Sequence, residues 1–92
     1  MRRLLKSAAF VRDVRSWLKR RPKDKAAIEA ALEQLLADAN APSLRTHKLH
    51  GPMAGYWACS AGYDLRVVFE FVEHEGNEAI LLLGLGTHDE LY

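Results

Sequence analysis

Apolar side chains recur at helical spacing in the first part of this 92-residue chain. Between Ser7 and Pro22 the apolar residues form one stripe, and basic residues occupy positions between them. The stripe consists of Phe10, Val11, Val14, Trp17 and Leu18. The Ser7 hydroxyl is placed to accept a backbone N–H of the first turn, and Pro22 ends this helix or opens the next. A second helix is predicted at about residues 23 to 39. Its buried stripe is Ile28, Leu32, Leu35 and Leu36.

The spacing then changes to that of strands. Residues 2 to 6 are a short extended candidate, residues 56 to 60 a second strand, and residues 63 to 73 a longer one with alternating apolar positions. Residues 74 to 77 form a hairpin turn with Gly76-Asn77 at its tip. The uninterrupted apolar run Ala79–Leu83 is typical of a strand with neighbours on both sides.

This order of elements predicts one α+β domain over residues 1–92. We expect a small antiparallel sheet, made of a short N-terminal strand and a three-stranded meander, with a two-helix hairpin packed on one side. The apolar content of 49% supports one modest core. Cys59 is the single cysteine, so neither an internal disulfide nor a structural zinc site is expected, and a reducing, cytoplasmic setting is favoured. The N-terminus has no signal-peptide pattern, and no segment is apolar for long enough to span a membrane.

Charge is distributed unevenly along the chain. Residues 1 to 25 carry ten Lys or Arg and two Asp, whereas residues 26 to 92 carry three Lys or Arg and ten acidic residues. Such a basic front suits a phosphate backbone or an acidic protein surface, although a solvated helix face would look the same. The candidate contacts on the first helix are Arg12, Arg15, Lys19 and Arg20.

Polar residues with chemical potential fall in three places. The Pro- and Gly-containing loop between residues 40 and 55 holds His47, Lys48 and His50. Asp64 and Arg66 begin the long strand, and His88 and Tyr92 follow the last strand. Antiparallel pairing brings the start of one strand beside the end of the next, so Asp64 and Arg66 should lie near Gly86 and His88. The path of the loop is left open.

These residue types suit the cleavage of RNA by its own 2′-hydroxyl. The reaction needs a base, an acid and a cation beside the phosphorus, and histidine and arginine supply all three without a metal or cofactor. A lone histidine is more often a bystander, and we interpret His74 in this way. Arg66 is more informative, because an arginine within an apolar strand must reach solvent or meet an anion.

Three segments resemble a known family. LHGPMAGYWAC resembles the "L-x-G-x-x-x-G-Y-R" passage of the YafQ-type branch of the RelE/ParE toxin superfamily, YDLRVVFEF resembles its long strand, and GLGTHDELY matches its ending "G-T-H-x-x-L-[FY]". The resemblance implies a RelE-like fold and a type II toxin that acts as a ribosome-dependent endoribonuclease. Such a toxin cuts messenger RNA in the A site without metal, contacts ribosomal RNA, and is neutralised by a cognate antitoxin.

By this resemblance the catalytic residues would be His88, His47, Asp64, Arg66 and Tyr92, and Lys48 and His50 would bind RNA. The chain departs from the branch pattern at four positions: Trp57, Ser60, Leu65 and Gly84. These departures leave open a weak or inactive toxin that only binds its antitoxin. A ParE-like inhibitor of DNA gyrase is the other alternative, although that group does not need the histidine-bearing tail.

Overall fold

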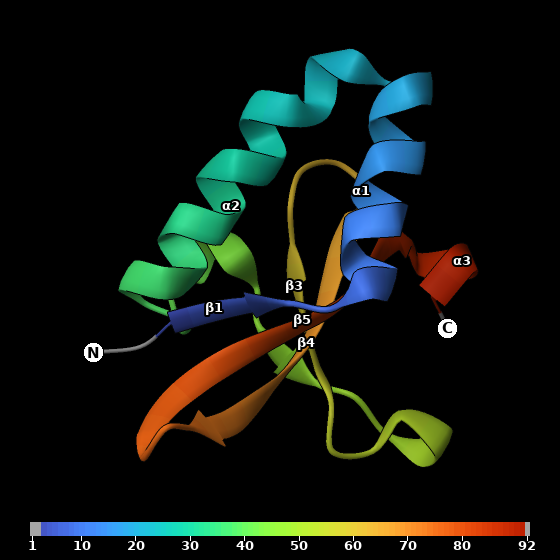
Figure 1. Ribbon diagram of the computed structural model, residues 1–92. Coiled ribbons are helices and arrows are strands. Elements are labelled where there is room, and N and C mark those ends of the chain that lie inside the picture. The colour runs from blue at the N-terminus through green and yellow to red at the C-terminus, as the bar shows by residue number, and fades with distance from the viewer. Residues whose placement is uncertain (1–2, 92) are drawn as a thin grey trace.

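Two long helices cover one face of a five-stranded sheet in the computed structural model, which describes residues 3–91 (Figure 1). The helices are α1 (Ala8–Arg20), α2 (Lys25–Ala37) and the short α3 (His88–Leu91). The strands are β1 (Arg3–Lys6), β2 (His47–Lys48), β3 (Trp57–Ser60), β4 (Leu65–His74) and β5 (Asn77–Thr87). Single 3-10 turns lie at Pro22–Asp24, Pro42–Leu44 and Gly51–Met53. Within residues 3–91, no helix has the length and apolar content needed to cross a bilayer.

The sheet has the order β1-β5-β4-β3-β2. The predicted α+β fold, with a meander and a helical hairpin on one side, is confirmed. Two details differ from the expectation. β1 pairs with β5 in parallel, which is possible because the intervening helices carry the chain back across the sheet. A fifth strand, β2, forms in the segment expected to be a loop, because His47 and Lys48 pair with Ala58 and Trp57.

The helix predictions hold in outline. Ser7 caps α1, and its hydroxyl accepts a hydrogen bond from the Phe10 N–H at 3.0 Å. Phe10 and Trp17 are buried as expected. In α2 the buried residues are Ile28, Ala31 and Leu35, whereas Leu36 is 42% exposed. The prediction that Leu36 is buried was therefore wrong, because the contact with the sheet is centred on the side of α2 that carries Ala31.

The alternation in β4 places its residues on two different faces. Leu65, Val67 and Phe69 belong to the core under the helices, together with Cys59 of β3. Arg66 lies between two core residues in the strand and so projects from the face opposite the helices. Its cross-strand partners are Ser60 on β3 and Gly86 on β5.

Two turns differ from the predicted boundaries. The β4–β5 hairpin has Glu75 and Gly76 at its tip, both with positive φ (52° and 79°), and His74 pairs with Asn77. The predicted Gly76-Asn77 tip is thus wrong by one residue, since a two-residue hairpin turn of this kind needs two consecutive positive-φ positions. Asp64 also has a positive φ of 57°, and β4 begins only after it.

Candidate active site

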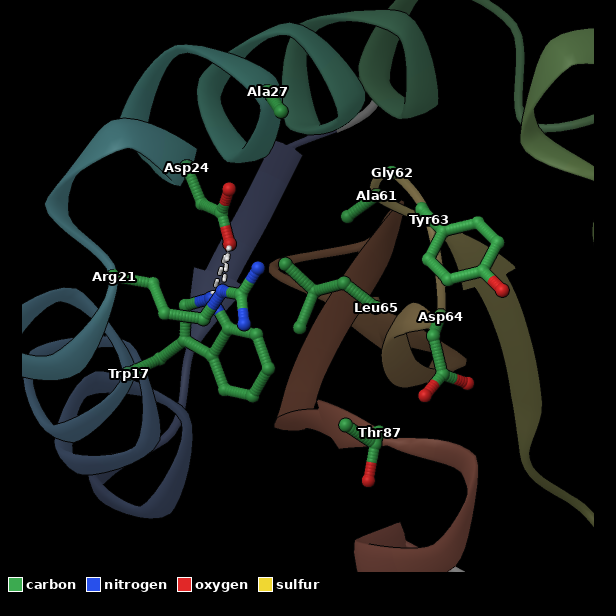
Figure 2. Close-up of a pocket in the computed structure, with 10 residues that line it drawn as sticks. All are labelled: Trp17, Arg21, Asp24, Ala27, Ala61, Gly62, Tyr63, Asp64, Leu65 and Thr87. Atoms are coloured by element: carbon green, nitrogen blue, oxygen red, sulfur yellow. Dashed lines mark hydrogen bonds and ion pairs between the residues drawn. The ribbon is translucent and has the colours of Figure 1, made fainter.

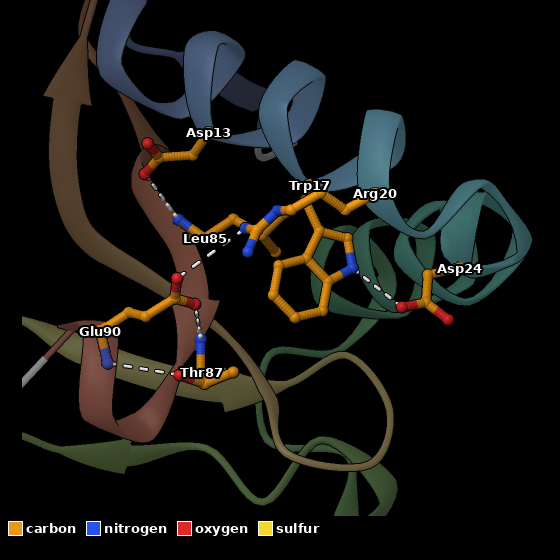
Figure 3. A network of polar contacts seen from close by, with 7 residues as sticks. All are labelled: Asp13, Trp17, Arg20, Asp24, Leu85, Thr87 and Glu90. Atoms are coloured by element: carbon orange, nitrogen blue, oxygen red, sulfur yellow. Dashed lines mark hydrogen bonds and ion pairs between the residues drawn. The ribbon is translucent and has the colours of Figure 1, made fainter.

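The position of His88 is fixed by a capping box at the end of β5. The Thr87 N–H donates to Glu90 Oε1 at 2.9 Å, and the Glu90 N–H donates to Thr87 Oγ1 at 3.3 Å (Figure 3). The hydrogen bond from the Thr87 N–H lowers the pKa of Glu90 below its ordinary value, and the charge of Arg20 contributes in the same direction. His88 is the first residue of the helix that this exchange begins.

Two glycines in β5 make room for α3 to fold back over the strand. A Cβ on Gly86 would lie 3.2 Å from Glu90 Oε1 and 3.5 Å from Leu91 Cγ. A Cβ on Gly84 would lie 3.3 Å from Asp13 Oδ2 and 3.5 Å from Leu91 Cδ2. A side chain at position 84 would therefore crowd Asp13 and Leu91, and glycine keeps this close approach of α1 and α3 open.

Helix α1 holds the same end of β5 from the other side. Beyond the residues paired with β1, the Leu85 N–H donates to Asp13 Oδ2 at 3.1 Å, and Arg20 approaches Glu90 at 3.8 Å (Figure 3). Arg20 also lies over the Trp17 ring, 5.2 Å from its centroid. By sequence, Arg20 groups with the three other basic candidates of α1, but it differs from them because its side chain contacts Glu90 and Trp17. Arg12, Arg15 and Lys19 line a shallow depression on one exposed face of the helix.

His47 and His88 line one depression, which settles the path of the 40–55 segment. The depression has a volume of about 490 Å³, and its other side chains include Lys48, His50 and Leu91. His47 Nδ1 lies 2.9 Å from the backbone oxygen of Arg45. Because a carbonyl oxygen only accepts, this contact places a proton on Nδ1 and leaves Nε2 as the acceptor of a neutral ring. His88 Nδ1 lies 3.7 Å from Asp89 Oδ1, and both side chains are exposed.

Arg66 and Asp64 line a different depression from the histidines. Arg66 is paired with Gly86 in the sheet, so the expected approach of the two strands is confirmed. The Arg66 guanidinium, however, donates a hydrogen bond to the backbone oxygen of Leu65 at 3.2 Å. Arg66 lines a depression together with Ser60 and Arg45. The expectation that Arg66 would share a pocket with His88 is not met, because α3 occupies the space above Gly86.

Asp64 also borders a fourth depression, between α1 and the turn before β4 (Figure 2). Trp17, Arg21 and Asp24 form one wall of it, and the Trp17 indole N–H donates to Asp24 Oδ2 at 2.8 Å. The polar groups of this wall already contact one another, since both Trp17 and Arg21 contact Asp24. We therefore place the candidate chemistry in the histidine depression.

The remaining residues singled out from the sequence are engaged in packing or lie outside the described residues. Trp57 meets Phe71 edge to face at 5.3 Å, and the Lys48 ammonium lies 5.4 Å from the Trp57 centroid. Cys59 is buried in the core as expected, and burial raises the pKa of its thiol to about 12, against a smaller opposing effect of Arg66. Leu65 is a core residue. Tyr92 lies outside the described residues.

Sequence reasoning missed two residues beside Arg66. Arg45 has a left-handed backbone (φ 50°) that ends the turn at residues 42–44, and Tyr63 is fully exposed. Neither belongs to a periodic pattern. The signal that could have found Tyr63 is its place in the Gly62-Tyr63-Asp64 turn, where no strand or helix can bury an aromatic ring. Within residues 3–91, no group of three His, Cys, Asp or Glu side chains is arranged to hold a metal ion.

The chain is similar to several solved toxins along its whole length. YafQ from E. coli is 18% identical and superposes with a TM-score of 0.79, covering 100% of this chain and 99% of that one. The E. coli DinJ-YafQ toxin-antitoxin complex gives 19% identity and a TM-score of 0.76, with 99% and 97% covered. A YoeB/ParE toxin from Agrobacterium tumefaciens gives 17% identity and a TM-score of 0.75, with 94% and 98% covered. These likenesses show the fold.

The family itself is shown by sequence. Residues 2–92 match the family model described as the bacterial toxin of type II toxin-antitoxin system, YafQ. No sequence among the curated proteins matches the chain. The match includes His47, His50 and His88 of the depression and the whole fold described above. The chain therefore belongs to the YafQ family and is a toxin of the type II toxin-antitoxin class.

Proposed function

We propose that this toxin is a ribosome-dependent endoribonuclease that cleaves messenger RNA by attack of the 2′-hydroxyl on the adjacent phosphodiester. The observation that supports the proposal best is that His47 and His88, which come from separate segments of the chain, line the same depression. Two imidazoles on opposite sides of one phosphodiester provide a base and an acid that both titrate near neutral pH. The family membership supports the same reading.

The hydrogen bonding of His47 favours it as the base. Its Nδ1 proton is directed to the backbone oxygen of Arg45, so Nε2 is the atom that takes the proton from the 2′-hydroxyl. The 2′-oxygen then bonds to phosphorus and the bond from phosphorus to the 5′-oxygen breaks. His88, beside Asp89, gives its proton to the leaving 5′-oxygen. The products are a 2′,3′-cyclic phosphate and a 5′-hydroxyl.

Lys48 stabilises the negative charge that develops on the phosphate oxygens. It lines the histidine depression and is exposed, whereas Arg66 lies in the neighbouring depression. Removing one such contact is expected to cost about 2.7 to 4 kcal/mol of transition-state stabilisation. His50 extends the same surface. The roles predicted for Asp64, Arg66 and Tyr92 stay predictions.

The proposed partners follow from the toxin class. DinJ binds YafQ in the E. coli complex, and we expect a cognate antitoxin to bind this toxin in the same manner. The ribosome presents messenger RNA in its A site within a surface of ribosomal RNA, and the exposed cations of α1 are suited to such a surface.

The experiment compares wild type, His47→Ala, His88→Ala and the control His74→Ala in cells, with 5′-hydroxyl ends of transcripts mapped by sequencing. His74 lies at the β4–β5 hairpin, away from the depression. We expect wild type and the control to cut translated messages, and we expect at least a hundredfold fewer cuts from His47→Ala and His88→Ala.

One other outcome would contradict the proposed mechanism, and two would contradict the nuclease function itself. Full toxicity and unchanged cuts in His88→Ala would remove His88 from the mechanism. DNA-damage signalling without transcript cleavage would favour a gyrase inhibitor. Harmless overexpression of folded wild-type protein would favour an inactive toxin that only binds its antitoxin.

A further inference from the structure

An open depression beside the histidines combines two arginines with an exposed aromatic ring. It has a volume of about 560 Å³, and the side chains that matter are Arg45, Arg66, Tyr63, Asp64 and Ser60. The exposure of Tyr63 is 102% of its reference value, so its ring contributes nothing to the core. A fully exposed aromatic beside two guanidinium groups is the combination that binds single-stranded nucleic acid, by stacking on a base and pairing with a phosphate.

The arginines keep donors available for a ligand. Arg66 uses one N–H for the backbone oxygen of Leu65, and the guanidinium has five in all. Among the described residues, no ion pair joins Asp64 to Arg45 or Arg66. The depression therefore carries two cations and one carboxylate that do not cancel by direct contact. A guanidinium in this state is suited to bidentate binding of a phosphate.

One backbone contact links this depression to the histidine depression. Arg45 lines one and His47 lines the other, and His47 Nδ1 is bonded to the Arg45 backbone oxygen at 2.9 Å. Arg45 and His47 are two residues apart and in contact, so a ligand long enough to leave the histidine depression on this side would reach Arg45. In a polynucleotide, the next group along the strand is a second phosphate with its base.

We propose that Tyr63, Arg45 and Arg66 form a subsite for the nucleotide next to the scissile phosphate of single-stranded RNA. The arginines bind its phosphate, and Tyr63 stacks on its base. Base-paired RNA is excluded from this arrangement, because its bases are already stacked within the duplex. The inference rests on the proposed nuclease function, and it gives Arg66 a role in binding the substrate outside the reacting centre.

The test measures binding without cleavage. A short fluorescein-labelled single-stranded RNA with 2′-fluoro groups in place of its 2′-hydroxyls cannot be cut by the proposed reaction, and its affinity is read by fluorescence anisotropy. We expect Tyr63→Ala to weaken binding fivefold or more and Tyr63→Phe to bind within twofold of wild type, because phenylalanine keeps the stacking face. Arg45→Gln should weaken binding and reduce the slope of log affinity against log salt by about one.

A control variant separates local contacts from net charge. Lys23→Gln removes one exposed charge at the turn Pro22–Asp24, outside this depression, and should bind as wild type does. The inference is overturned if wild type does not bind the RNA at low salt, or if Tyr63→Ala binds as well as wild type. It is also overturned if Tyr63→Ala weakens only the antitoxin complex.

Failure of the subsite and failure of the nuclease proposal give different results. If transcripts are cut in a His88-dependent way but Tyr63→Ala binds RNA normally, the subsite is wrong and the nuclease stands. If Tyr63→Ala and Arg45→Gln weaken RNA binding but no transcript is cut, the site binds RNA and the nuclease is wrong. Tyr63 is exposed, so its variants should fold, and thermal unfolding checks this.

Discussion

Thr87 and Glu90 exchange two hydrogen bonds across the first turn of α3, and His88 lies between them in the chain. A four-residue helix has little stability of its own. This reciprocal pair, with Leu91 against Gly84 and Gly86, therefore determines where the imidazole lies.

The first prediction concerns the pH dependence of this cap. Because the pKa of Glu90 is lowered from 4.5 in the folded protein, its charge adds stability above that value, and the addition is lost as the pH falls through the lowered pKa. Glu90→Gln keeps an acceptor oxygen but no charge. We expect the difference in free energy of unfolding between wild type and Glu90→Gln to be positive at neutral pH and to shrink in acid, as measured by urea unfolding at a series of pH values.

Glu90→Ala serves as the comparison, because it removes the acceptor as well as the charge. It should reduce transcript cleavage more than Glu90→Gln does, since His88 loses its fixed position. A difference between wild type and Glu90→Gln that stays constant down to strongly acid pH would contradict the lowered pKa.

A second prediction concerns Asp13, which accepts the Leu85 N–H where β5 extends beyond β1. Asp13→Ala leaves this strand N–H without its acceptor and should cost about 1–3 kcal/mol in free energy of unfolding. Asp13→Asn retains an acceptor oxygen and should cost less. Denaturant unfolding measures both, and equal losses would show that the hydrogen bond is not the source of the stability.

A third prediction concerns the thiol of Cys59. Burial raises its pKa to about 12, so at neutral pH almost none of it is the reactive thiolate. A thiol reagent should leave the native protein unmodified and react completely in denaturant. Cys59→Ser buries a hydroxyl in the core and should cost about 1–3 kcal/mol, with Cys59→Ala as the apolar comparison. Fast labelling of the native protein would contradict the buried position.

A fourth prediction concerns the basic face of α1, formed by Arg12, Arg15 and Lys19. Changing all three to Glu should weaken binding to isolated ribosomes and make the remaining affinity less dependent on salt. Lys23→Glu is the single-charge control at the neighbouring turn. Sedimentation with ribosomes at several salt concentrations measures the effect. Binding by wild type that does not change with salt would contradict an electrostatic contact.

Local patterns in the sequence were sufficient for most of the elements. The stripe from Phe10 to Leu18 and the alternation from Leu65 to Phe71 each reflect one buried face, so the period reveals the element. β2 could not be found in this way. Its two residues, His47 and Lys48, are both exposed, and they form a strand only because β3 lies beside them.

The site was only partly predictable for a related reason. Strand register is set by pairing, and the neighbourhood of Arg66 and Gly86 followed from the meander. The separation of Arg66 from the depression that holds His88 depends on how α3 folds back over Gly86, which is a tertiary contact without a local pattern. The missed Tyr63 illustrates the same limit, since exposure in a turn leaves no periodic mark.

The parallel pairing of β1 with β5 also has a consequence for the order in which the fold is completed. Residues 3–6 find their partners only in residues 79–82, so during synthesis the first strand cannot pair until residues 79–82 have left the ribosome. Because α3 and His88 follow β5, the histidine depression is assembled last. A partly synthesised chain that stops before His88 therefore has only one wall of the histidine depression.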